Sequence, residues 1–338
     1  MVCLMVALNV RGVYAQNLSD IPRPQTIGEW GQLAVPAAEI QAARGASANN
    51  EPVNLLLPQN LTQIEAAFLE LLQKEGTWRA DAIQWETPLE AQHPLASFDF
   101  TPYASSTLTL KSLATLAEQL QAVVQKYNTL FVIGFYPEHL PDGTEHLMVK
   151  LTPLTLGKLT IQGGKHFSER SIKRLLGFEE GMPLEPLTLA KRMRLIMDNP
   201  DIKLSGQLAF DASNHQTDLT LDVEDSHTLH ASLFVNNLDQ TFYGPQTAGV
   251  SFIANNLTGG QDTLVSTTIT ENRVTAEYLH YERPLNKHGT RLGIDYAYGR
   301  ANPIGSDYDP YALRGRFWSL TTSVMQPIIA KRWASFKY

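Results

Sequence analysis

The sequence predicts two α+β units of strand and helix order β-α-α-β-β, followed by the N-terminal part of an antiparallel transmembrane β-barrel. The first observation is that helical stripes of apolar residues between positions 53 and 226 recur in a repeated order. The second is that, after Asp225, apolar residues alternate with small or polar ones and no helical stripe follows. The change falls within Leu219 to Asp262. One alternating strand there ends the soluble part, and a second strand, from Leu229, opens the barrel.

Composition limits the classes of function. The chain of 338 residues is long enough for two or three domains. Its net charge of -7, with no block of Lys and Arg, makes nucleic acid an unexpected partner. No run of about eighteen apolar residues follows the N-terminus, so no transmembrane helix is expected there. A membrane location would therefore require a barrel.

Residues 1–15 are predicted to be a signal peptide, because an apolar stretch ends at the small-residue site Val13-Tyr14-Ala15. No Lys or Arg precedes the apolar core, so a merely hydrophobic N-terminus is the alternative. Cleavage after Ala15 would remove Cys3, the single cysteine, and the mature chain would need no disulfide. Residues 16–52 are interrupted by proline and rich in alanine, which predicts a linker with one short helix.

Residues 53–156 are predicted to form the first unit. Val53 to Leu57 is an apolar run typical of a strand, and helical spacing of apolar residues follows to Glu75. Thr109 is a plausible N-cap for a second helix. Two strands then complete the order, Leu130 to Tyr136 and His146 to Thr155, joined by a turn containing Asp142-Gly143.

Residues 157–226 repeat this order in a shorter form. A strand ends before Gly163-Gly164, and Ser168 is expected to cap a helix that Gly177 ends. The second helix must end before Asn199-Pro200, because the residue before proline is disfavoured in helices. The closing strands are Ile202 to Phe210 and Thr217 to Glu224.

Residues 227–338 are predicted to form a partial outer-membrane β-barrel of about six strands. The strands hold about ten residues each, with apolar side chains on one face and small or polar ones on the other, which is typical of barrel strands. A soluble β-sandwich is the alternative that periodicity alone leaves open. The apolar sets are Leu229, Ala231, Leu233 and Val235; Ala248, Val250, Phe252 and Ala254; Val265, Thr267 and Ile269; Leu292, Ile294, Tyr296 and Tyr298; and Trp318, Leu320, Thr322 and Val324.

Four segments resemble a known family. The stretch from Tyr136 to Gly143, the glycine at Gly157, and Gly181-Met182-Pro183-Leu184 are similar to the POTRA domains of the ShlB/FhaC/HecB haemolysin secretion and activation proteins. The junction from Asn236 to Asp262 resembles that family's first barrel hairpin. The resemblance implies a two-partner secretion transporter of the Omp85 superfamily. Such a protein binds an unfolded secreted exoprotein in the periplasm and translocates it across the outer membrane.

Two departures from the family pattern bear on this interpretation. The family's glycine-aromatic pair before the second POTRA strand is absent, and Gly134-Phe135 comes several residues late. The family's barrel needs roughly sixteen strands, more than residues 227–338 can supply, so the resemblance implies a C-terminally truncated product or a fragment. Arg314-Gly315 is similar to a conserved family loop motif, but its position predicts an ordinary loop before a strand.

No catalytic constellation is found in the sequence. The nine histidines do not fall at metal-ligand spacings, and His139, His146, His280 and His288 are interpreted as solvated turn and barrel-face residues. Glu179-Glu180 is interpreted as a solvated pair rather than an acid/base dyad. No phosphate loop or nucleophile elbow occurs. We therefore expect no enzyme activity, no cofactor and no metal.

With no catalytic site predicted, the function that we expect is recognition of a partner through a sheet edge. An extended client can add a strand to an exposed edge by using backbone hydrogen bonds. Simple packing of the strands is the alternative. Two other functions are considered besides secretion: an Omp85-type assembly factor, and a soluble periplasmic binding module. The expected partners are an unfolded exoprotein and outer-membrane lipid. There are two candidate edges. The second is Ile202 to Phe210, and the first consists of Phe131, Val132, Ile133, Gly134, Phe135 and Tyr136.

Overall fold

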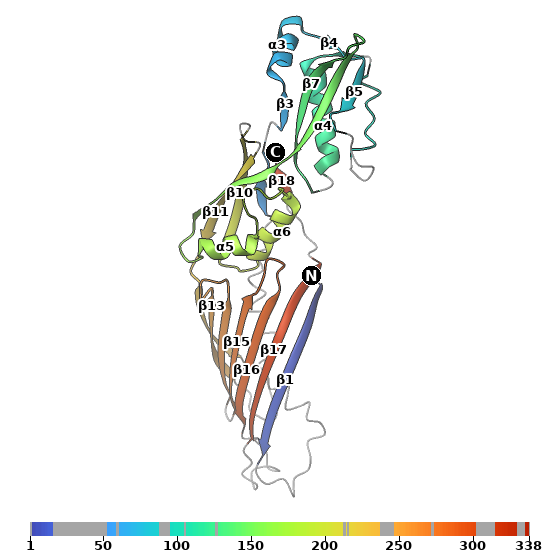
Figure 1. Cartoon of the computed structure of the whole chain (residues 1–338). Helices are drawn as coiled ribbons and strands as arrows, with labels where there is room; N and C mark the ends of the chain where they lie inside the picture. Colours follow the sequence, from blue (N-terminus) through green and yellow to red (C-terminus); the bar gives the residue numbers. More distant parts are fainter. Residues whose placement is uncertain are drawn as a thin grey trace.

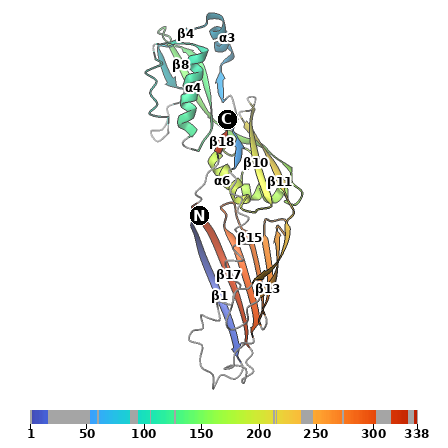
Figure 2. The ribbon, with the colours of Figure 1, turned by 180° about the vertical axis from the view of Figure 1, so that it is seen from behind.

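The protein consists of three parts arranged in series, two α+β units and one large sheet (Figures 1 and 2). The structure is a computed structural model and describes residues 2–15, 53–58, 61–87, 95–104, 106–125, 128–211, 214, 216–236, 247–271, 274–301, 315–329 and 335–337. The predicted linker, residues 16–52, and the loop residue Arg314 lie outside these ranges. None of the helices within them is long and apolar enough to cross a membrane.

The first unit packs helices against a four-stranded sheet of order β3-β7-β8-β5. These strands are β3 (Thr62–Ile64), β7 (Phe131–His139), β8 (Glu145–Pro153) and β5 (Ala82–Trp85). The helices are α3 (Ala66–Glu75) and α4 (Leu110–Gln125), and β4 (Trp78–Arg79) pairs with β6 (Thr107–Leu108). The apolar stripe of α4 is buried at Leu113, Leu116, Leu120 and Val124 and partly buried at Val123, as its spacing predicts. The core includes Phe68, Leu72, Leu113, Leu116, Leu120, Ile133, Phe135 and Leu147.

The second unit has the predicted β-α-α-β-β order. Its elements are β9 (Thr155–Gly163), α5 (Glu169–Leu176), α6 (Pro186–Ile196), β10 (Ile202–Asp211) and β11 (Gln216–Asp225). The last strand, β11, lies between the other two strands of the unit, parallel to β9 and antiparallel to β10. The side chain of Ser168 accepts a hydrogen bond from the backbone N–H of Ser171, and Gly177 ends α5 in the left-handed conformation.

The strand expected at Val53 to Leu57 belongs to a different sheet from the one predicted. Residues Asn54–Leu56 form β2, which runs parallel to β10 of the second unit. Leu55 is fully buried in the core of the second unit, with Val53 and Leu57 beside it. In the first unit, β5 takes the place of the first strand and lies parallel to β8. A short apolar run gains the same burial in either sheet, so local periodicity does not select between them.

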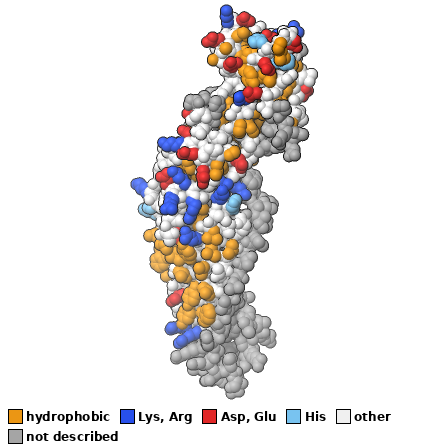
Figure 3. Space-filling view, viewed as in Figure 1, with side chains coloured by type: hydrophobic (Ala, Val, Ile, Leu, Met, Phe, Trp, Pro, Cys, Tyr) orange, Lys and Arg blue, Asp and Glu red, His pale blue; other side chains and the backbone are white. Residues whose placement is uncertain are grey.

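The large sheet contains six consecutive antiparallel strands from residues 229 to 329, as predicted. They are β12 (Leu229–Asn236), β13 (Thr247–Asn255), β14 (Thr263–Glu271), β15 (Val274–Pro284), β16 (Arg291–Ala301) and β17 (Gly315–Ile329). One face of the sheet exposes large apolar side chains, visible as hydrophobic patches in Figure 3. These are Leu229, Leu233, Val235, Phe252, Leu279, Ile294, Tyr296, Leu320 and Val324.

The face predicted for β14 is wrong. Val265 and Thr267 are buried on the inner face of the sheet, where Thr267 lies opposite Ser251. The outer face of β14 instead carries Leu264, which lies opposite Ala254. The outer face combines Leu264 with Ser266 and Thr268, and the inner face combines Val265 and Ile269 with Thr267. Alternation alone does not tell which of the two sets faces outward. The hairpin register decides, because shifting it by one residue exchanges the two faces.

Residues Val2–Ala15 form a strand, β1, that pairs antiparallel with β17. The register places Leu8 opposite Thr322, and β1 is the terminal strand of the seven-stranded sheet. The segment predicted as a signal peptide is therefore a sheet strand in the intact chain. Cleavage after Ala15 stays a prediction, and it would leave β17 as the last strand of the sheet.

Candidate functional site

The first predicted binding edge is not free. The segment of β7 from Ile133 to Phe135 pairs in parallel with β3 on one side, and with β8 on the other. The backbone N–H of Ile133 donates to the carbonyl of Leu61 at 2.9 Å. Val132, Ile133 and Phe135 are buried, whereas Phe131, Gly134 and Tyr136 are half-buried. The edge predicted to be exposed at Phe131 to Tyr136 is thus covered from Ile133 to Phe135 by β3, a strand from earlier in the chain, and client binding at this edge stays a prediction.

The second predicted edge is covered as well. Residues Ser205 to Gln207 of β10 pair in parallel with β2, and β18 (Ser335–Lys337) pairs in parallel with the far side of β2. We call residues 53–58 and 61–65 the strap, because this short segment supplies a strand to both units. Leu55 anchors it in the core of the second unit, and Ile64 packs against the core of the first. The strap therefore joins the two sheets through their backbones.

The inner face of the large sheet is polar and hydrogen-bonded. The hydroxyl of Ser251 lies 3.0 Å from that of Thr267. The carboxylate of Asp295 accepts from the Tyr278 hydroxyl at 2.5 Å and lies 2.7 Å from the Nδ1 atom of His280. His280 was expected to be solvated, and this is wrong: only 4% of it is exposed. Its position in β15 places it on the inner face, where the neighbouring strand supplies a carboxylate partner.

Two aromatic rings on the inner face pack over glycines of the adjacent strand. Phe234 lies opposite Gly249, and Phe317 lies opposite Gly299. A Cβ atom added at Gly249 would come within 2.2 Å of the Phe234 ring, and one added at Gly299 would come within 2.1 Å of Phe317. Both glycines are thus required by close approach rather than by an unusual backbone conformation.

Asp201 connects the second unit to the large sheet. It lies just before β10 and only 6% of it is exposed. Its carboxylate accepts from the Nδ2 atom of Asn255 at 2.8 Å and lies 2.9 Å from the Nε2 atom of His230. Its backbone carbonyl accepts from the N–H of Ser226, where the chain passes from β11 to β12. One buried carboxylate thus binds the first two strands of the sheet.

The turn between β13 and β14 docks on the second unit. Asp262 is fully buried and accepts from both the N–H and the hydroxyl of Thr258. The Asn256 side chain donates to the carbonyl of His166 at 2.6 Å, and the Ser168 hydroxyl donates to the carbonyl of Gly259 at 3.2 Å. The stretch from Asn255 to Asp262 that resembled a family motif is therefore a docking turn, a role that the sequence pattern did not reveal.

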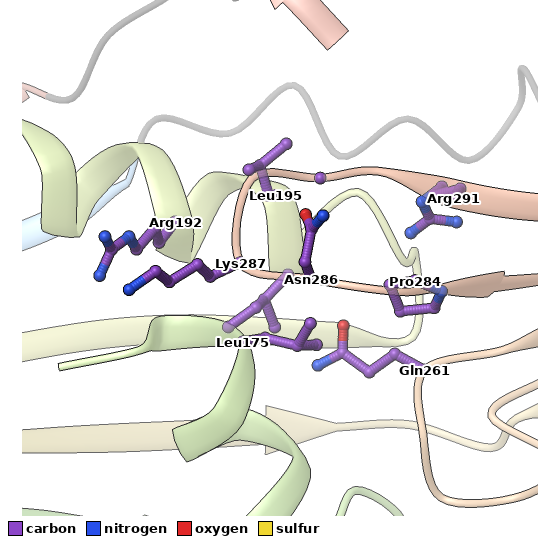
Figure 4. Close-up of a pocket in the computed structure, with 10 residues that line it drawn as sticks. Leu175, Arg192, Leu195, Gln261, Pro284, Asn286, Lys287 and Arg291 are labelled. Atoms are coloured by element: carbon purple, nitrogen blue, oxygen red, sulfur yellow. The ribbon is translucent and has the colours of Figure 1, made fainter. Parts of the chain in front are cut away.

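A second contact between the unit and the sheet involves the turn between β15 and β16. A shallow pocket there is lined by Leu175, Arg192, Gln261 and Lys287 among others (Figure 4). The side chain of Lys287 lies over Gly177, where an added Cβ atom would come within 2.4 Å of the Lys287 Cδ atom. The guanidinium of Arg192 donates to the carbonyls of Leu176 and Gly177 and lies 4.5 Å from the Phe178 ring centroid. The end of α5 is thus fixed against the sheet.

Asp225 orders the loop that precedes α5. Its Oδ2 atom accepts from the backbone N–H groups of Lys165 and His166 at 2.6 Å, and from that of Phe167 at 3.4 Å. Desolvation acts to raise the pKa of Asp225, but these hydrogen bonds to the charged form prevail and lower the pKa below its ordinary value.

Stability should therefore fall in acid through this group. A carboxylate whose pKa is lowered in the folded state contributes fully to stability when the pH is above its unfolded-state pKa of about 4. This stabilisation is lost as the pH falls through the folded-state pKa. We expect Asp225→Asn to reduce the acid dependence of the melting temperature between about pH 4 and pH 2. Thermal melts in detergent over this range test it. An acid dependence equal to that of the unsubstituted protein would contradict the role of Asp225.

The described residues contain no group of three or more His, Cys, Asp or Glu side chains that could hold a metal ion. Glu179 and Glu180 are both exposed. The contacts of the described residues join the two α+β units to each other and the second unit to the large sheet. Two α+β units in series are joined to an antiparallel sheet with an apolar outer face and a polar inner face, and such two-sided strands are typical of transmembrane β-barrels.

No family model and no curated protein matches the sequence. The structure is similar to CdiB from Acinetobacter baumannii, with a TM-score of 0.55 and 16% identity over 94% of this chain and 61% of that structure. It is also similar to CdiB from Escherichia coli, with a TM-score of 0.52 and 14% identity over 90% of this chain and 55% of that structure. BamA from Haemophilus ducreyi lacking POTRA domains 1-3 aligns at 14% identity and a TM-score of 0.42, over 75% of this chain and 53% of that structure.

The chain thus has the fold of the two CdiB structures, and the resemblance predicted from the sequence is confirmed at the level of fold. It spans between one half and two thirds of the length of these structures.

Proposed function

We propose that this chain is part of a two-partner secretion transporter of the outer membrane. Its two α+β units are POTRA domains that receive an unfolded exoprotein in the periplasm, and its sheet is part of the barrel through which that client passes. The observation that carries the proposal is the two-sided sheet, which has an apolar outer face and a hydrogen-bonded polar inner face and is held to the second unit by Asp201.

The outer face fits a lipid environment. Strands β13 to β16 contain 9 to 11 residues, which is the length that a tilted strand needs to cross the hydrocarbon core of about 30 Å. Leu233 and Val235 of β12 are 86% and 81% exposed, and burying such side chains in lipid removes their contact with water. A chain that stays monodisperse without detergent would contradict the membrane location and support a soluble binding module.

The inner face fits passage of an extended polypeptide. Its hydroxyl and carboxylate groups, including those of Ser251, Thr267 and Asp295, are satisfied by one another in the sheet. A lumen lined in this way offers a client polar contacts without deep apolar pockets that would retain it.

Client binding at Phe131 to Tyr136 stays a prediction. Because the strap covers β7 and β10, a client would reach Phe131 to Tyr136 only after displacing β3. Two other edges are alternative binding places for the client. One is the edge strand β5, and the other is the second half of β9, beyond the pairing of Thr155 with Pro183. The strap itself supports strand addition as the binding mode, because it joins both sheets as short parallel strands paired through the backbone.

Site-specific photo-crosslinking in cells tests the proposal. A crosslinking residue at Ser319, on the inner face, should capture a co-expressed two-partner exoprotein, whereas one at the neighbouring Leu320, on the outer face, should not. Equal capture at both positions, or at neither, would contradict transport through the barrel.

An assembly factor is the alternative function. It is favoured by one observation: among the residues that the structure describes, β12 is a terminal strand of the sheet and pairs with β13 alone. A factor of this kind would template a nascent barrel protein on that edge. Crosslinks from β12 to an outer-membrane barrel client, without crosslinks from Ser319 to an exoprotein, would support it.

A further inference from the structure

Helix α5 carries a cluster of cations beside the periplasmic ends of the strands. The segment 165–174 contains Lys165, Arg170, Lys173 and Arg174 against one carboxylate, Glu169. All four cations are exposed. Lys287 joins them, because its stem packs over Gly177 at the end of the helix. We call these five side chains the basic collar. Figure 3 shows Lys and Arg side chains gathered in a band at the level of α5 and α6, next to the apolar face of the sheet.

The position of the collar relative to the sheet is fixed by hydrogen bonds. His166 and Ser168, at the start of α5, are bonded to Asn256 and Gly259 in the turn that ends β13. The collar therefore lies at the height where the lipid-facing strands end. The same turn exposes Leu257, which is 56% accessible, and the adjacent strand β12 begins at Leu229, which is 72% accessible.

Local acidic groups neutralise only part of this charge. Glu169 lies 2.6 Å from Lys173 in an exposed pair, and such pairs contribute little. Asp225 is occupied by the backbone N–H groups of Lys165, His166 and Phe167. Glu179 and Glu180 follow Gly177 and lie beyond the end of the helix. The cations are therefore directed outward with a net positive charge.

We propose that the basic collar binds the headgroups of anionic phospholipids in the membrane leaflet that faces the second unit. This inference rests on the proposed membrane location. An exposed cation at a membrane surface attracts anionic lipid by about 1 kcal/mol, or about 5-fold in local concentration, and the attraction is screened by salt. The exposed leucines enter the acyl region while the cations contact the phosphates, and the lipids would hold the second unit at a defined angle to the membrane.

Spin-labelled lipids measure this selectivity directly in the full chain reconstituted into phosphatidylcholine vesicles. We expect phosphatidylglycerol to be enriched over phosphatidylcholine among the motionally restricted lipids beside the protein. The variant Arg170→Gln/Lys173→Gln/Arg174→Gln should lose most of this enrichment. The matched control Lys74→Gln/Arg79→Gln/Lys111→Gln changes the net charge equally, on exposed residues of the first unit, and should keep it.

The outcomes separate the two proposals. Absence of any motionally restricted lipid would contradict the membrane location itself. Restricted lipid with no preference for phosphatidylglycerol, or an equal loss of preference in the collar variant and the control, would overturn the collar while leaving the membrane location intact. Raising the salt concentration to about 1 M should abolish the preference, because the Debye length falls to about 3 Å.

Discussion

Leu55→Asp is expected to release the strap from the second unit. Leu55 is fully buried, and its Cδ1 atom would lie 2.8 Å from a Cβ atom added at Gly206 of β10. Removing a buried leucine costs about 2 to 5 kcal/mol, and an unpaired buried carboxylate adds a desolvation penalty. The pairing of Asn54–Leu56 with Ser205 to Gln207 should therefore be lost. Amide hydrogen exchange, read by mass spectrometry, should accelerate at least 30-fold in residues 53–57, since 2 kcal/mol corresponds to about that factor.

Leu56→Asp is the matched control for this substitution. Leu56 is the next residue and is 40% exposed on the opposite face of the same strand. The control should leave exchange in residues 53–57 almost unchanged. If both variants behave alike, the strap is not held by the buried face of β2. If the strap competes with a client for the sheet edges, Leu55→Asp should also increase crosslinking of an exoprotein from positions on β10.

Asp201→Ala is expected to uncouple the second unit from the large sheet. The substitution removes hydrogen bonds to Asn255 and His230 and leaves the buried amide of Asn255 without its carboxylate partner. Hydrogen bonds to charged groups contribute about 1.5 to 3 kcal/mol each, so the loss should reach about 3 kcal/mol. Hydrogen exchange should increase across residues 226–230, where the chain enters β12, while the cores of the two units stay protected.

Asp222→Ala provides the control for this change. Asp222 is also on the second unit, but it bonds an exposed partner, Gln162. Its substitution should leave exchange at residues 226–230 unchanged. A double-mutant cycle of Asp201→Ala with Asn255→Ala isolates the pair, and a coupling energy near zero would show that Asp201 does not hold the sheet.

Much of the fold could be predicted from local patterns. The order of the second unit, the cap at Ser168, the stop at Gly177 and the six strands from Leu229 onward all follow from spacing and turn chemistry, which act between neighbours in the chain. The candidate binding edge could not be predicted in the same way. Whether a strand has a free edge depends on every other strand in the molecule, and β3 covers β7 from about 70 residues away.

The junction between the second unit and the large sheet also has features that the sequence predicts and features that it does not. The sequence marks Asn255 to Asp262 as a glycine-containing turn between alternating strands, but gives no sign that Asn256 bonds His166 or that Asp201 bonds Asn255, 54 residues away. His280 is similar, since its burial follows from the hairpin register that places Asp295 beside it.

By itself, the sequence determined the element types and order of the second unit and the change from α+β units to two-sided strands, because these depend on the periodicity of side chains along one segment. Only the tertiary structure decided which sheet takes Asn54–Leu56, which face of β14 is buried, and which edges remain open. Those choices depend on backbone pairing between distant segments, and a short apolar strand satisfies its hydrogen bonds and its burial equally well in several places until the whole chain has folded.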